Sequence, residues 1–145
     1  LGAQLLSVAY GTEYEHSPKR EIGVFPITLT EAGLEDEHVK VLGPTLMTGH
    51  WHGDMPGLSE DAVVLASSQG CPRQIIRFSP KHYAFQAHLE FDQESVDLLI
   101  AADGEAVLQE QSQNLDFVQQ PDVIRNYDYR EMNAKLYAFL DSLTK

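Results

Sequence analysis

The nine residues YAFQAHLEF, Tyr83 to Phe91, combine the apolar side chains of a buried strand with one imidazole and one carboxylate. Successive side chains of a strand point to opposite faces, so residues two positions apart share a face. His88 and Glu90 have this spacing, which predicts that their side chains lie within hydrogen-bonding reach. Such a pair is either an exposed ion pair at a strand end or a histidine that a carboxylate orients for catalysis.

Composition limits the class of protein before any further motif is considered. The 145 residues are enough for one domain with a sizeable core, and 43% of them are hydrophobic. Ten basic residues against 22 acidic ones give a net charge of −12, which argues against nucleic acid or an anionic membrane as partner. No apolar run approaches the ~20 residues of a membrane span. The single cysteine, Cys71, excludes an internal disulfide and favours a reducing, cytoplasmic location.

The hydrophobic pattern predicts alternating strands and helices, and therefore an α/β fold. Helices are expected over residues 1–11, 92–103 and 128–145, the first ending at Gly11 and the second capped by Asp92. Strands are expected over residues 21–30, 44–54, 62–68, 73–79 and 82–90. Pro26 indicates an edge or a bulge, and Pro80–Lys81 a tight turn. Residues 104–127 are polar and weakly patterned, and no element is predicted there.

Several segments, in this order, resemble the class I glutamine amidotransferases, in particular the stand-alone proteins similar to GMP synthase. They are LGAQ (1–4), EIG (21–23), HWHGD (50–54), LASS (65–68), CP (71–72) and FQAHLE (85–90), and the resemblance runs from Leu1 to about Ile100. Family members cleave the side-chain amide of glutamine with a cysteine, a histidine and a glutamate. The resemblance implies that His88 is the general base and acid and that Glu90 orients it. The family's usual His-Pro-Glu is His88-Leu89-Glu90 here.

The family's nucleophile lies on a sharp turn between a strand and a helix, in a pattern like Gly-x-Cys-Leu-Gly-x-Gln. Leu1-Gly2-Ala3-Gln4 matches this pattern from the residue directly after the cysteine. The resemblance therefore implies that Leu1 contributes its backbone N–H to the oxyanion hole and that Gly2 permits close backbone approach. It implies that Gln4 hydrogen-bonds the glutamine substrate. It also implies that the nucleophile precedes Leu1 and that residues 1–145 are the C-terminal portion of one amidotransferase domain.

The family fold is a flavodoxin-like arrangement of three layers, a mostly parallel sheet flanked by helices. We therefore expect a mostly parallel sheet here, with the N-terminal strands of that fold missing. Missing strands would leave an apolar sheet edge uncovered, which favours aggregation or a homo-oligomer. Because the nucleophile is missing too, the chain tested alone is expected to be inactive.

Two other motifs allow a different interpretation. Cys71 could replace the nucleophile, but the following Pro72 lacks the backbone N–H that an oxyanion hole needs, and no helix begins there. The segment 50–54 could hold a metal, because His-x-His and an aspartate supply imidazole and carboxylate ligands. The resemblance instead assigns Trp51 and His52 to the glutamine pocket and Glu21 to its rim. We therefore expect neither a metal nor another cofactor.

The sequence thus predicts a glutamine amidotransferase that hydrolyses glutamine and delivers the ammonia to a synthetase. Two alternatives stay open. The same triad would serve a γ-glutamyl peptide hydrolase, and a non-catalytic module could keep a glutamine-shaped pocket. Both enzymes require a cysteine before Leu1, whereas the binding module does not.

Overall fold

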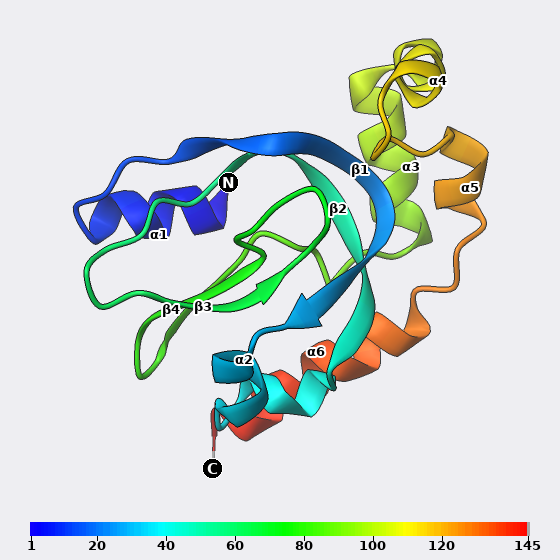
Figure 1. Ribbon diagram of the computed structural model, residues 1–145. Helices are drawn as coiled ribbons and strands as arrows, with labels where there is room; N and C mark the ends of the chain where they lie inside the picture. The colour runs from blue at the N-terminus through cyan, green and yellow to red at the C-terminus, as the bar shows by residue number, and fades with distance from the viewer. Residues whose placement is uncertain (145) are drawn as a thin grey trace.

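The computed structural model describes residues 1–144, which form one five-stranded sheet with helices around it (Figure 1). The strands lie in the order β2-β1-β3-β4-β5. Their bounds are Glu15–Leu29 (β1), Thr45–Met55 (β2), Val63–Ser67 (β3), Ile75–Ser79 (β4) and His82–Phe85 (β5). The two long strands β1 and β2 pair over most of their length and curve together across the molecule.

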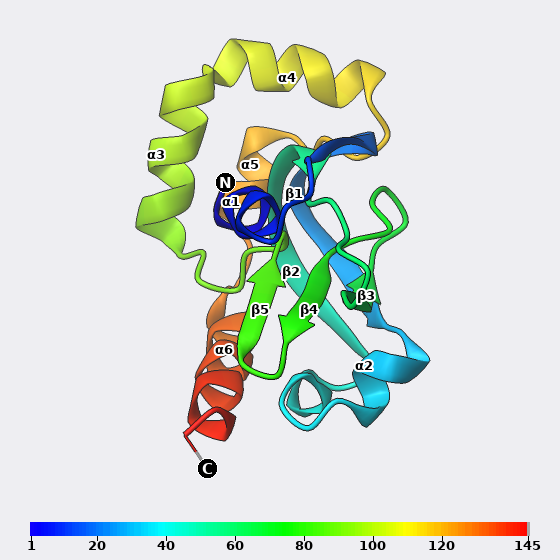
Figure 2. The same ribbon diagram turned by 90° about the vertical axis from the view of Figure 1, so that its left-hand side faces the viewer.

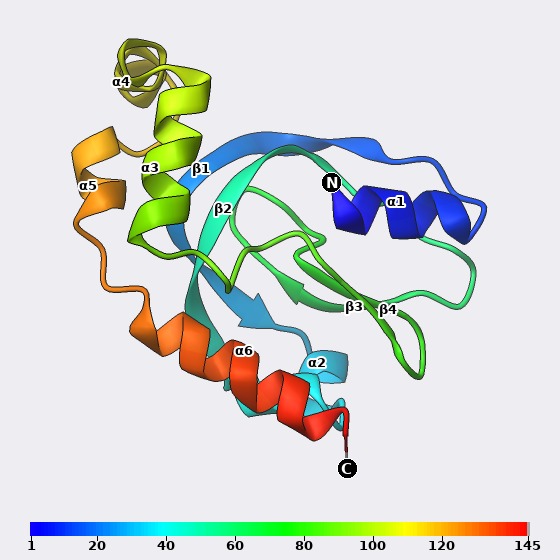
Figure 3. The same cartoon turned by 180° about the vertical axis from the view of Figure 1, so that it is seen from behind.

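The helices gather in three places around this sheet. Their bounds are Gly2–Ala9 (α1), Glu31–Glu35 (α2), the 3₁₀ helix Val39–Leu42 (η1), Gln93–Asp103 (α3), Glu105–Asn114 (α4), Pro121–Arg125 (α5) and Arg130–Ser142 (α6). Helices α3, α4 and α5 lie together beside the bend of β1 and β2, and α6 lies with α2 near the C-terminal end of β1 (Figures 1 and 3). In the view of Figure 2, helix α1 lies above the hairpin of β4 and β5.

The expectation of a mostly parallel sheet is wrong for this part of the chain. All four strand pairs among the described residues are antiparallel. Parallel neighbours need a crossover of a dozen or more residues, usually a helix. Here the longer helices α3, α4 and α6 all follow the last strand, and β4 joins β5 through the predicted turn at Pro80–Lys81. The α/β class is confirmed, and the parallel arrangement is not.

The core consists of three apolar clusters, each between the sheet and a different set of helices. The first lies between the sheet and α6 and includes Leu65, Ile75 and Phe139. The second packs β1 against α3, α4 and α5 through residues such as Ile22 and Ile100. In the third, Ala3 of α1 contacts Ile76, Phe78 and Ala84 of the strands β4 and β5. Helix α1 is therefore anchored on the same hairpin that leads to His88.

Several local predictions are confirmed. Helix α1 ends before Gly11, which has a φ of +77°, and Asp92 caps α3 by accepting a hydrogen bond from the Ser95 N–H. Pro26 lies where β1 has only β2 beside it, because β1 meets β3 only at Thr28 and Leu29.

The helices η1, α4 and α5 were not predicted, and β1 begins at Glu15, six residues before its predicted start. Helices α4 and α5 fall in the segment for which no element was expected, and only Leu108 of α4 is buried. One buried residue in a ten-residue helix leaves no apolar stripe to recognise. Strand β5 ends at Phe85, five residues before the predicted end.

No helix among the described residues is long and apolar enough to cross a membrane.

Candidate active site

His88 and Glu90 form the hydrogen bond that their spacing predicts. His88 Nδ1 lies 2.6 Å from Glu90 Oε1. The two residues lie beyond the end of β5, where His88 forms a single antiparallel bridge with Gly49 of β2. The His88 N–H donates to the Gly49 carbonyl at 2.8 Å, and the Gly49 N–H donates to the His88 carbonyl at 2.9 Å. The backbone of the pair is thus fixed to the sheet, and its geometry suits a histidine oriented by a carboxylate.

The imidazole of His88 also has an aromatic neighbour. The ring of Phe91 stacks on it, with the ring centroids 4.6 Å apart and the planes 10° from parallel. A Cβ atom at Gly49 would lie 2.2 Å from Phe91 Cδ2, so only glycine leaves room for this ring. The stack and the hydrogen bond to Glu90 together limit how far the imidazole can rotate.

Asn133 of α6 holds the segment that carries the pair. Its Nδ2 donates to the carbonyls of Leu89, at 2.7 Å, and Phe91, at 3.0 Å. These carbonyls flank Glu90, so one side chain restrains the backbone on both sides of the carboxylate. This restraint stands where the family's usual proline would stiffen the chain, since position 89 is leucine here.

The side chains of the pair differ in exposure, with 29% of His88 and 60% of Glu90 accessible to solvent. Burial raises the pKa of the Glu90 carboxyl, but the hydrogen bond and charge of His88 together with backbone hydrogen bonds outweigh it, and the net shift is downward. Glu90 is therefore ionised at neutral pH and can accept a hydrogen bond from the imidazole N–H at Nδ1. Nε2 is then free to act as a base.

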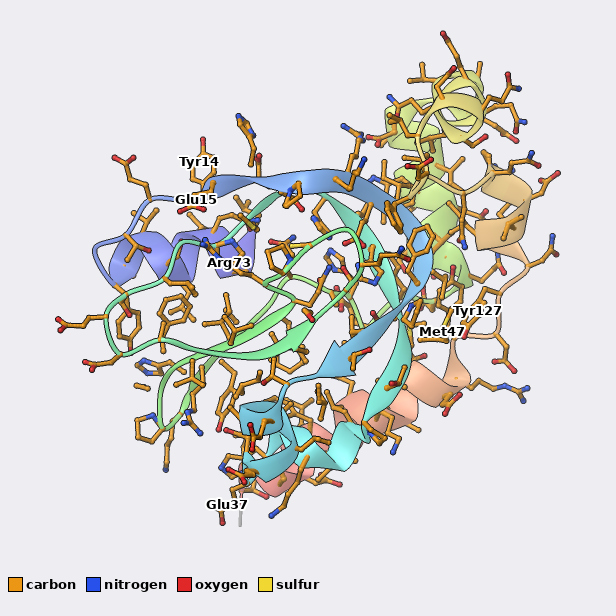
Figure 4. All side chains as sticks on the ribbon, viewed as in Figure 1. Tyr14, Glu15, Glu37, Met47, Arg73 and Tyr127 are labelled. Carbon is orange, nitrogen blue, oxygen red and sulfur yellow. The ribbon has the colours of Figure 1, made fainter. Side chains whose placement is uncertain are left out.

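A pocket of about 390 Å³ brings four predicted binding residues together: Leu1, Gln4, Trp51 and His52. Its other lining residues are Tyr14, Gly53, Asp54 and Gln86. Tyr14 lies beside Glu15 and Arg73, which form an ion pair at 3.1 Å near α1 (Figure 4). Gly2, His88 and Glu90 are not among the lining residues, although Gln86 of the wall is only two residues from His88.

Two residues that line the pocket each have a buried hydrogen-bond acceptor without a partner, Gln4 Oε1 and His52 Nδ1. Gln4 Nε2 donates to Gln86 Oε1 at 2.5 Å, which fixes the amide with its oxygen unpaired. His52 Nε2 lies 2.9 Å from a carboxylate oxygen of Glu21, so that nitrogen carries the proton and Nδ1 has a free lone pair. Two unpaired acceptors suit a ligand that brings N–H groups.

Sequence reasoning placed Glu21 at the rim of the pocket, and this is wrong. Glu21 is fully buried, and with His50, His52, Ser68 and Gln74 it forms what we call the buried polar cluster. The register of the sheet explains the position, because Glu21 of β1 pairs with His52 of β2.

The Glu21 carboxylate is well supplied with donors. Oε1 accepts from Ser68 Oγ at 2.7 Å and from the Gly70 N–H at 3.2 Å, and Oε2 accepts from Gln74 Nε2 at 2.7 Å. Burial raises the pKa of this carboxyl, but hydrogen bonds from His50, His52 and Ser68 outweigh it, and the pKa falls well below its usual range. Glu21 is thus a buried, ionised carboxylate.

Sequence reasoning missed Gln74 and misjudged Glu21. The available signal was a polar residue embedded in an apolar strand segment, as in Arg73-Gln74-Ile75-Ile76. Such residues are buried only when partners satisfy them.

Cys71 is fully buried, and burial raises the pKa of its thiol. A buried, protonated thiol is a poor nucleophile. These properties agree with excluding Cys71 from catalysis.

Known proteins resemble this chain over nearly its whole length. No protein-family profile matches it. Over 144 residues it is 45% identical to the glutamine amidotransferase-like protein YfeJ of Salmonella typhimurium, a match that covers 99% of this chain and 59% of that protein. This match confirms the resemblance to the glutamine amidotransferases. It spans about 59% of the length of this curated relative.

Solved structures share the fold of this chain. The structure of SMU.1228c is 56% identical, with a TM-score of 0.97, and the match covers 100% of this chain and 61% of that one. A glutamine amidotransferase of Thermotoga maritima is 16% identical, with a TM-score of 0.79 over 99% of this chain and 59% of that one. At this identity the second likeness shows a common fold alone.

Proposed function

We propose that the protein containing this chain is a glutamine amidotransferase in which His88 and Glu90 serve a cysteine nucleophile that precedes Leu1. The observation that carries the proposal is the 2.6 Å contact between His88 Nδ1 and Glu90 Oε1, in a segment fixed by Gly49 and Asn133. In this proposal residues 1–145 are the C-terminal portion of a single amidotransferase domain.

The reaction has two halves. His88 Nε2 takes the thiol proton, and the thiolate attacks the side-chain carbonyl carbon of glutamine. The carbon–nitrogen bond then breaks as His88 returns the proton to the leaving nitrogen, which gives ammonia and a thioester. In the second half His88 deprotonates a water molecule, the water attacks the thioester, and the carbon–sulfur bond breaks to release glutamate.

Two further parts of the chain assist this chemistry. The backbone N–H of Leu1, in a peptide bond with the cysteine, donates to the oxyanion, since the residue after such a nucleophile occupies that position. The unpaired acceptors Gln4 Oε1 and His52 Nδ1 suit the ammonium group of an amino-acid substrate.

The ammonia is passed to a synthetase partner in the cytoplasm. An apolar groove between β5 and α6, lined by residues such as Phe85, Leu136 and Leu140, supports a contact with another protein surface, including a second copy of the chain.

The test is ammonia release from glutamine by the protein at its natural length. His88→Ala should lower kcat/KM by about 10²–10⁴-fold, the usual contribution of a general acid–base residue. His82→Ala is the matched control, because His82 is an exposed histidine on the adjacent hairpin and bonds only Tyr10. Its activity should stay within about 2-fold of the unmodified protein.

The same assay separates the alternatives. A strong preference for a γ-glutamyl dipeptide over glutamine would show a peptide hydrolase with the same triad. No reaction with either substrate would favour the binding module and overturn the proposal. The 145-residue chain alone should release no ammonia, because its one thiol, on Cys71, is buried.

A further inference from the structure

Four polar side chains of the buried polar cluster converge on one point between β1 and β2. Glu21 Oε2 lies 2.9 Å from His52 Nε2 and 3.4 Å from His50 Nδ1. The terminal amide nitrogen of Gln74 lies 2.7 Å from the same Glu21 oxygen and 3.3 Å from each of these imidazole nitrogens. One carboxylate, two imidazoles and one amide therefore face a common centre with almost no exposure to solvent.

These separations match the edges of a metal-coordination tetrahedron. A zinc ion with ligands at 2.0–2.1 Å places its ligand atoms about 3.3–3.4 Å apart. The ligand atoms of Glu21, His50 and His52 all lie within 4.8 Å of one another. Turning the Gln74 amide by half a turn would present Oε1, a buried oxygen without a hydrogen-bond partner, at the fourth corner. Shifts of a few tenths of an ångström would then complete four-coordination.

Neighbouring groups already hold two of these ligands in the required direction. His50 Nε2 lies 3.2 Å from the Phe25 carbonyl and 3.0 Å from Thr48 Oγ1. A carbonyl only accepts, so Nε2 carries a proton, and release of the Nδ1 proton on metal binding would leave the Nδ1 lone pair facing the centre. Glu21 Oε1 accepts hydrogen bonds from Ser68 Oγ and the Gly70 N–H, which leaves Oε2 facing the centre. Protein metal ligands usually have outer hydrogen bonds of this kind.

We propose that Glu21, His50 and His52, with Gln74 as the fourth ligand, bind a divalent transition metal of the zinc class. Two imidazole nitrogens favour such an ion over Mg²⁺ or Ca²⁺, which prefer oxygen ligands. All four positions are filled by the protein, so the site is structural and joins β1, β2 and the segment before β4. This proposal does not depend on the proposed amidotransferase activity.

Metal binding would also change the pocket wall. Coordination through His52 Nε2 requires the proton of that imidazole to move to Nδ1. His52 lines the pocket, and its Nδ1 has no hydrogen-bond partner. His52 would then offer the pocket a donor instead of an acceptor. Metal binding would thus change which hydrogen-bonding groups of a ligand the pocket can bind.

The test is a zinc titration of the protein at its natural length, after a chelator has removed any bound metal. Competition with a chromophoric chelator measures the affinity. We expect one equivalent to bind with a Kd below about 1 μM. His50→Gln should weaken binding by at least about 100-fold, and Ser68→Ala, which removes an outer hydrogen bond, by about 10-fold. His82→Gln changes an exposed histidine and should leave the Kd unchanged.

The ligands can be identified without any variant. In imidazole ¹H–¹⁵N spectra of the unmodified protein, addition of zinc should move the signals of His50 Nδ1 and His52 Nε2 and leave those of His16, His38 and His82 in place. A folded protein that binds no zinc would overturn the proposal. So would binding that shifts only the exposed histidines, and this outcome decides the matter even if His50→Gln does not fold.

Discussion

The buried polar cluster and the His88–Glu90 pair contain the same two chemical groups in opposite surroundings. Glu21 and His50 have no exposed side-chain surface, whereas 29% of His88 and 60% of Glu90 is exposed. Both carboxyls have a lowered pKa because an imidazole faces them. The Glu21 carboxylate and the His50 imidazole cannot be reached from solvent, whereas the imidazole of the pair can.

The difference teaches that burial separates a structural role from a catalytic one. An exposed ion pair contributes about 0–1 kcal/mol to stability, whereas removing one partner of a buried pair costs about 3–5 kcal/mol. Variants of the cluster should therefore act mainly on stability. Variants of the pair should act mainly on activity.

The largest effect is expected for Glu21→Ala. The change leaves His52, Ser68 and Gln74 buried without their acceptor, and it should lower the free energy of unfolding by about 3–5 kcal/mol. Urea unfolding followed by circular dichroism measures this. The matched control is Glu90→Ala, which removes an exposed carboxylate and should cost less than about 1 kcal/mol. Equal losses for the two variants would contradict the contrast.

Part of the Glu21 contribution should depend on pH. The pKa of Glu21 is lowered in the folded protein from its ordinary value of 4.5. Its stabilisation is therefore fully present above about pH 4.5 and is lost as the pH falls toward the folded pKa. Between pH 5 and pH 3 the melting temperature of the unmodified protein should fall more steeply than that of Glu21→Gln. Parallel curves would show that Glu21 is not ionised in the folded state.

Glu90→Gln should affect activity more than stability. The neutral amide oxygen accepts a weaker hydrogen bond from the imidazole N–H than the carboxylate does, and a hydrogen bond to a charged group is worth about 1.5–3 kcal/mol. We expect kcat/KM for glutamine to fall by about 10–150-fold, less than the loss for His88→Ala. A change below 2-fold would remove Glu90 from the proposed triad.

The smallest effect is expected for Asn133→Leu. Two hydrogen bonds to the Leu89 and Phe91 carbonyls are lost, which should cost about 1–2 kcal/mol of stability. Because the segment holding Glu90 is loosened, kcat should fall while KM changes little. Asn126→Leu is the control, since its Nδ2 also donates to a carbonyl, that of Asp122, but far from the pair. A KM effect equal to the kcat effect would argue against a positioning role.

The two regions also differ in how far the sequence predicted them. The His88–Glu90 contact depends on a spacing of two residues, and the local pattern was enough. The buried polar cluster depends on the register that pairs Glu21 with His52 and on a turn that brings in Gln74. These residues are far apart along the chain, so only the pairing of strands reveals that they meet.

The directions of neighbouring strands also could not be predicted from local sequence patterns. Short apolar runs predicted that strands exist, but not whether neighbours run parallel or antiparallel. The expected parallel sheet came from the family resemblance, while the connections in this chain join antiparallel neighbours. Helix α4 buries only Leu108, so its pattern was too weak to predict.

The central claim is that a thiol next to Leu1, activated by His88, attacks glutamine. Its most direct test is labelling of the protein at natural length with a glutamine analogue that carries a chloroketone in place of the side-chain amide. Peptide mass spectrometry should find one equivalent on a cysteine directly before Leu1, blocked by glutamine and abolished by His88→Ala. Label on Cys71, or no label at all on the folded protein, would contradict the account.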